Sequence, residues 1–223
     1  MRENMVTRDR MKRAWDYFGW GLYAFAGLGI DALVLMVLQQ IYGKSFGEWE
    51  TFEYCIHWSI VCLGWGCVVW LLKRAADRKY GENLLRQKEK FTRNGFLMSA
   101  ALVIILVTAE TMLWDGFKPV REFVRLGAVK FGFQYVYYFL EVLLVLLIVV
   151  FGQRCGECLT GKKRIPWGGI MLAFTWGLVH CLTKGMATGI EAFLTSFCYG
   201  TIYLGVNRNI PWSYALLAVA FLL

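Results

Sequence analysis

The sequence predicts an all-α protein, a polytopic transmembrane helical bundle of six or seven spans. Hydrophobic residues make up 58% of the 223-residue chain and aromatic residues 17%, whereas a soluble domain is about 45–50% apolar. The mean hydropathy is +0.48. The apolar residues fall in runs of about 20, the length that crosses roughly 30 Å of hydrocarbon as a helix. A lipid bilayer is therefore the predicted surrounding.

Six runs reach this length, and each is predicted to be one span. They cover residues 18–42, 54–73, 94–114, 131–151, 166–184 and 187–205. A seventh run, 211–223, follows Pro211 and would give only about 20 Å of helix. It is either a half-span or the start of a longer segment. We expect the natural chain to continue, because no polar residue follows Leu223.

The basic residues predict the orientation. With a cytoplasmic N-terminus, the inner segments hold five, eight, four and one Lys or Arg, which is 18 of the 24 in the chain. These segments are 1–17, 73–93, 152–165 and 206–210. Such a bias is typical of the cytoplasmic side. The formal charge of +8 therefore indicates orientation in a membrane, predicted to be a bacterial plasma membrane, and not nucleic-acid binding.

The polar segments between the runs predict three further helices. Residues 1–17 form an amphipathic cytoplasmic N-terminus, expected to rest on the inner membrane surface. Residues 74–93 are charged on most faces and predict a cytoplasmic helical extension. In segment 117–130, Pro119 suits a first helical turn. Apolar residues follow it at helical spacing, which predicts a short helix in the outer interface: Val120, Phe123, Val124 and Gly127.

Six ionisable residues lie inside the apolar runs: Asp31, His57, Glu110, Glu141, His180 and Glu191. Each is a functional candidate, because a polar group in hydrocarbon costs free energy unless it is paired or hydrated. His57 and Glu110 lie near span ends and favour a structural role, and Asp31 suits either role. Glu141 lies ten residues from each end of its run, so it must face the bundle interior, be protonated, or line a wet cavity.

Glu141 and His180 suggest a chemistry if their helices are adjacent. A buried carboxylate can take a proton from water while an imidazole donates to developing negative charge. Glu191, eleven residues after His180, is a further member that we rank below these two. No cofactor or metal is predicted, since His180, Cys181 and Glu141 make a poor zinc set.

The stretch from Phe174 onward resembles the CAAX-protease and bacteriocin-processing (CPBP, or Abi) family of intramembrane proteases. Its sequence is FTWGLVHCLTKGMATGIEAFLTSFCYGTIYLGVNRNIPWSYALL. The segment Trp176-Gly177-Leu178-Val179-His180 is similar to the family's Phe-x-x-x-His motif, and Glu141 lies where the family has Glu-Glu-x-x-x-Arg. The resemblance implies one integral membrane domain, 1–223, with accessory spans in 18–130 and a CPBP-like core in 131–223. It also implies that Glu141 activates water and His180 acts near the scissile carbonyl.

The catalytic set of this family is incomplete in the chain. The first motif has one glutamate and no arginine, with Val145 and Leu146 in that place, and the family's His-x-x-x-Asn aligns with Leu217 and Phe221. The sequence therefore predicts a non-catalytic relative that binds a peptide, lipid or membrane partner. Two alternatives stay open: an active glutamate/histidine intramembrane endopeptidase that processes a membrane-associated peptide, and an accessory subunit of a membrane transporter.

Overall fold

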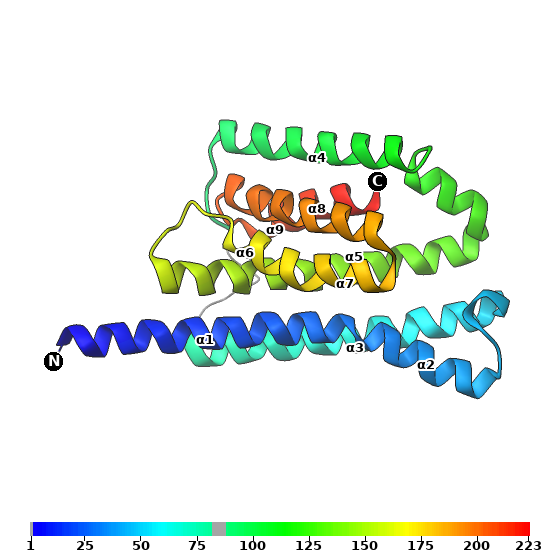
Figure 1. Ribbon diagram of the computed structural model, residues 1–223, viewed down its shortest axis with the longest axis horizontal. Helices are drawn as coiled ribbons and strands as arrows, with labels where there is room; N and C mark the ends of the chain where they lie inside the picture. The colour runs from blue at the N-terminus through cyan, green and yellow to red at the C-terminus, as the bar shows by residue number, and fades with distance from the viewer. Residues whose placement is uncertain (1, 82–87) are drawn as a thin grey trace.

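The computed structural model describes residues 2–81 and 88–223, with side chains from residue 8 onward (Figure 1). Within these ranges the chain forms helices and no β-strand, which confirms the all-α prediction. In chain order the elements are α1 Arg2–Leu28, α2 Ile30–Tyr42, the 3₁₀ turn η1 Phe46–Glu48, α3 Thr51–Tyr80, α4 Arg93–Leu113, α5 Lys118–Thr160, α6 Trp167–Leu172, the π-helical turn η3 Ala173–Gly177, α7 Leu178–Thr183, α8 Met186–Gly205 and α9 Ile210–Leu222.

Four helical stretches of the described chain are long and apolar enough to cross a membrane. They are Arg8–Tyr42, Thr51–Tyr80, Arg93–Leu113 and Lys118–Thr160. Two shorter apolar stretches, Trp167–Thr183 and Ile210–Leu222, accompany them. The four long stretches indicate a membrane protein in a lipid bilayer.

The first predicted span, 18–42, differs from the structure at its start and near its middle. α1 is continuous from Arg2, so residues 2–17 are the first turns of the same helix and not a separate surface helix (Figure 1). The predicted span is then broken at Gly29, where α1 gives way to α2. Glycine lowers the cost of such a break because it disfavours the helix interior.

The predicted cytoplasmic extension after the second span is helical in its first part. α3 continues to Tyr80 and ends at Gly81, whose left-handed φ of 65° closes the last turn. Residues 82–87 lie outside the described residues. Residues 88–92 form no regular secondary structure, and α4 begins at Arg93.

The second half of α5 is the centre of the fold. Leu144 to Phe151 are fully buried, because α1, α3, α6, α8 and α9 all contact this helix. A helix with neighbours on every side is expected to be apolar all round, and this explains the uninterrupted sequence VLLVLLIVVF. Glu141 lies immediately before this stretch, so its position in the bundle is fixed by the best-packed helix.

Glycines let α6 and α8 approach each other closely. A Cβ built on Gly200 of α8 would lie 2.5 Å from the backbone nitrogen of Gly169 in α6. A Cβ on Gly168 would lie 2.1 Å from the carbonyl oxygen of Val149 in α5. Small residues at such crossings allow backbones to touch. This packing positions the helix that continues from α6 through η3 to His180.

The connections gather at two ends of the bundle (Figure 1). We call one the basic end: the start of α1 and the segments 88–92, 161–166 and 206–209. Arg10 donates to the carbonyl of Cys158 at 3.1 Å, and Arg208 pairs with Glu157 at 2.5 Å. We call the other the cavity end, formed by segments 43–50, 114–117 and 184–185. The described parts of the four segments predicted to share one side of the membrane thus lie at one end of the bundle (Figure 1).

Candidate functional site

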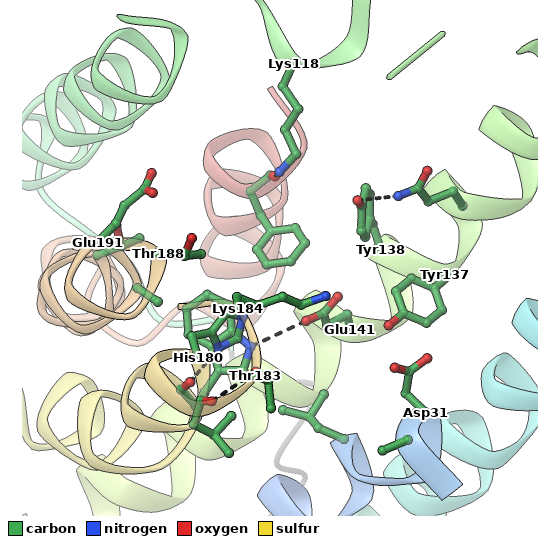
Figure 2. A pocket seen from close by; sticks show the side chains of 18 of the residues that line it. Asp31, Lys118, Tyr137, Tyr138, Glu141, His180, Thr183, Lys184, Thr188 and Glu191 are labelled. Atoms are coloured by element: carbon green, nitrogen blue, oxygen red, sulfur yellow. Dashed lines mark hydrogen bonds between the residues drawn. The ribbon is translucent and has the colours of Figure 1, made fainter. Parts of the chain in front are cut away.

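A cavity of about 1120 Å³ opens among the helices toward the cavity end. Its wall contains residues from α1, α2, α3, α4, α5, α7, α8 and α9. All six ionisable residues of the apolar runs line it: Asp31, His57, Glu110, Glu141, His180 and Glu191. Figure 2 shows most of them around one central space. This cavity, which collects the ionisable side chains of an apolar bundle, is therefore the candidate site.

Glu141 and His180 are joined through Trp176. The indole Nε1–H of Trp176 donates to Glu141 Oε1 at 3.4 Å. His180 Nδ1 lies 2.7 Å from the backbone oxygen of Trp176, and the two rings are 4.3 Å apart. Within residues 8–81 and 88–223 no hydrogen bond links Glu141 directly to His180. The structure thus brings both predicted residues to one cavity, with an indole between them.

The backbone around Trp176 explains how it reaches both partners. η3 is a π-helical turn, Ala173–Gly177, inserted between α6 and α7. A π-turn adds a residue to one turn, and such insertions are frequent at functional sites. In the sequence, Trp176 is visible only as the aromatic residue of the segment that ends at His180. Its hydrogen bonds to Glu141 and His180 depend on the π-helical turn.

The hydrogen bond of His180 fixes its tautomer. A carbonyl oxygen can only accept, so His180 Nδ1 must carry the hydrogen that reaches Trp176. In the neutral imidazole Nε2 is then an acceptor. His180 can therefore donate a hydrogen bond from Nε2 only when the ring is doubly protonated.

Glu191 lines the same cavity on another wall (Figure 2). Its carboxylate accepts from the indole Nε1 of Trp114 at 3.1 Å. Among the described residues no hydrogen bond joins it to His180. Glu191 is thus part of the wall without being a bonded third member of the Glu141 and His180 set.

Asp31 and His57 form a second acid–imidazole pair that sequence reasoning did not find. His57 Nε2 lies 3.4 Å from Asp31 Oδ1, and the His57 side chain is almost completely buried. Its Nδ1 has no hydrogen-bond partner in the described part of the chain. Figure 2 shows the Tyr137 hydroxyl between the carboxylates of Asp31 and Glu141. The only sequence signal was the charge of each residue within an apolar run.

The predicted short helix after α4 exists as the first turns of α5, residues 118–126, with Pro119 in the first turn. Gly127, at φ 72° and ψ 167°, breaks the helix and turns the chain into the long part of α5. Only glycine adopts this conformation without strain. The apolar face is outward, with Val124 79% exposed, while Lys118 and Arg125 line the cavity.

Four cations of the cavity end line the cavity: Lys118, Arg125, Lys130 and Lys184. Lys118 is held 3.3 Å from Glu110 and donates to the carbonyl of Phe221 at 2.6 Å. The cavity wall thus combines carboxylates, Lys and Arg cations, and two imidazoles. In the described chain, no three His, Cys, Asp or Glu side chains converge as a metal site.

Comparisons of the chain with protein-family models, with curated proteins and with solved structures found no match. The fold and the cavity nevertheless define the class of protein. In its described residues the chain is all-helical, its four long apolar helices indicate a bilayer environment, and a large cavity lined by six ionisable side chains lies between them.

Proposed function

We propose that this chain is a non-catalytic relative of the CPBP intramembrane proteases, and that its cavity binds a peptide, lipid or membrane-protein partner. The observation that carries the proposal is the shared cavity of all six ionisable side chains. Such groups are costly in hydrocarbon unless they are paired or hydrated. Their collection around one space is expected of a site that holds a polar ligand.

The residues at the missing catalytic positions support the loss of catalysis. Val145, Leu146 and Leu217 are fully buried in the apolar core. Phe221 lines the cavity, with its ring 6.1 Å from that of Trp176. Apolar side chains at these places supply neither an arginine nor a His and Asn pair to complete the site.

The same proposal includes the membrane arrangement. The basic end faces the cytoplasm of a bacterial plasma membrane, in accord with the distribution of Lys and Arg. The shorter stretches Trp167–Thr183 and Ile210–Leu222, together with α8, then bring the bundle to six or seven spans. They belong to a CPBP-like core, 131–223, behind accessory spans in 18–130.

The experiment compares cleavage with binding. Purified protein is incubated with a panel of membrane peptides, and products and bound species are both measured by mass spectrometry. The wild type is compared with Glu141→Gln and His180→Ala. Asp115→Asn is the matched control, because Asp115 is exposed at the same end and does not line the cavity. We expect a bound species without products, weakened by both cavity variants only. Cleavage by the wild type would contradict the proposal.

A second candidate, an active glutamate/histidine endopeptidase, is favoured by the link through Trp176. In that reaction Glu141 takes a proton from water, the hydroxide attacks the peptide carbonyl, and the amide C–N bond breaks with the proton passing to the amine. His180 would stabilise the oxyanion only as a doubly protonated ring. Products that disappear in both Glu141→Gln and His180→Ala would establish this candidate.

A further inference from the structure

We propose that the cavity receives the basic side chain, Lys or Arg, of a membrane-associated peptide, with its charged nitrogen against Asp31 and Glu141. This inference rests on the binding function proposed above and adds the chemical class of the ligand. Four observations carry it: under-satisfied carboxylates, the absence of a Lys or Arg ion pair to them in the described residues, aromatic neighbours, and a mixed polar and apolar lining.

The carboxylates of Asp31 and Glu141 have fewer hydrogen-bond donors around them than they can accept from. A carboxylate offers about four lone-pair positions, yet Glu141 accepts one long bond from Trp176, and Asp31 has a long contact with His57 and a contact with the Tyr137 hydroxyl. Tyr137 points its hydroxyl at this pair (Figure 2), but a single O–H can serve only one of them. Under-satisfied charge is costly in a low-dielectric interior.

The nearby Lys and Arg side chains of the described chain form no ion pair with Asp31 or Glu141. Lys118 is engaged by Glu110 at 3.3 Å, and Arg125 lies 3.9 Å from Glu122. Within the described residues, no Lys or Arg nitrogen lies within 4.0 Å of Asp31 or Glu141. Lys184 points toward Glu141 from the exposed turn between α7 and α8 (Figure 2) without forming an ion pair. A ligand cation would therefore meet two carboxylates that form no ion pair with a Lys or Arg of the described chain.

The surroundings suit a cation on an apolar chain. Tyr137 and Trp176 line the cavity. Tyr137 lies near both carboxylates (Figure 2) and Trp176 donates a hydrogen bond to Glu141, and aromatic faces attract ammonium and guanidinium groups. Apolar side chains, among them Leu106 and Val179, line the same space. They suit the methylene stem of Lys or Arg and its apolar neighbours.

A peptide fits the remaining wall better than an aminolipid. Hydroxyl groups of Thr188 and Thr195 line the cavity alongside Gln134. These side chains offer donors and acceptors together, and a peptide backbone presents both N–H and C=O groups to such a wall. At about 1120 Å³ the cavity has room for several residues of a peptide.

The test uses the full chain in nanodiscs of phosphatidylcholine. The probes are an apolar peptide capped at both ends with one central lysine, and the same peptide with norleucine in that position. We expect the wild type to bind the lysine peptide at least about tenfold more tightly, the scale of one charge-assisted contact. Asp31→Asn and Glu141→Gln should bring this ratio close to one. Asp115→Asn should keep it.

Each alternative result of this binding experiment contradicts a specific claim. Equal binding of both peptides by the wild type would contradict the claim that the cavity recognises a basic side chain, while the proposed binding function would stand. No binding of either peptide, or of any lipid, would overturn the binding function itself. Displacement of the lysine peptide by phosphatidylethanolamine in the nanodisc, in the wild type but not in Glu141→Gln, would show that the ammonium comes from a lipid. Because the norleucine comparison is made on the wild type, misfolding of a variant cannot mask the result.

Discussion

Trp176 donates its indole hydrogen to Glu141 at 3.4 Å, from a π-helical turn that also presents its carbonyl oxygen to His180. Trp176 is therefore a positioning residue for both side chains. The bond is long, and it is the one hydrogen bond that reaches the Glu141 carboxylate in the described chain. The orientation of Glu141 toward the cavity depends on it.

Trp176→Phe should weaken ligand binding about threefold to tenfold and lower stability by about 1 kcal/mol, because it removes the donor and keeps an aromatic ring. Trp70→Phe is the control, since that ring is 54% exposed and does not line the cavity. Binding isotherms and unfolding in detergent give the two values. If Trp176→Phe behaves like the control, Trp176 does not position Glu141 for ligand binding.

The contact of Gly200 with Gly169 predicts a strong effect of one methyl group. Gly200→Ala should destabilise the bundle by about 1–3 kcal/mol, because the new Cβ meets backbone at 2.5 Å. Gly66→Ala is the matched control, with no heavy atom within 4 Å of its Cβ. It should be neutral, or stabilising by up to about 1 kcal/mol. Unfolding by a denaturing detergent, followed by Trp fluorescence, compares them. Equal midpoints would argue against this close helix crossing.

The ion pair of Arg208 with Glu157 closes the basic end. Arg208 reaches Glu157 at 2.5 Å and the carbonyl of Lys163 at 2.8 Å. Arg208→Ala should cost about 2–3 kcal/mol, because it leaves the mostly buried Glu157 carboxylate without its cation. Arg164→Ala, at an exposed residue of the neighbouring loop, should change stability by under about 0.5 kcal/mol. Thermal unfolding compares the two variants. Equal melting temperatures would contradict the prediction and show that Arg208 contributes no more to stability than an exposed arginine.

The proposed orientation predicts which loops face the outside of the cell. In a cysteine-free background, Lys44→Cys should react with a membrane-impermeant maleimide on intact cells, since segment 43–50 lies at the cavity end. Lys163→Cys, at the basic end, should react only after permeabilisation. Both residues lie in connections between helices, Lys163 exposed and Lys44 partly exposed, so a soluble reagent can reach either one. The reverse pattern would invert the orientation.

Much of the helical layout could be predicted from the sequence, since long apolar runs have few alternatives to helices. Pro119 correctly predicted the start of a short helix, and the apolar sequence after Glu141 agreed with a central helix. The break at Gly29 and the continuity of α1 from Arg2 were missed. Both depend on how the helix packs on its neighbours, which composition does not report.

The candidate site was predictable only as a set of charged residues. The six ionisable positions were visible as exceptions to apolar runs, and they line one cavity. The pairing of Asp31 with His57 was not visible, because the two residues lie on different helices and share no local motif. The role of Trp176 between Glu141 and His180 was also missed, since it depends on the π-helical turn.

Photo-crosslinking tests the central claim, a ligand-binding cavity, most directly. A lysine-bearing peptide with a diazirine beside the lysine is bound to the protein in nanodiscs, irradiated, and mapped by mass spectrometry. We predict adducts on cavity residues such as Leu106, Val179 and Thr188. Adducts confined to exposed apolar residues outside the cavity, such as Leu63 and Ile104, would contradict the account.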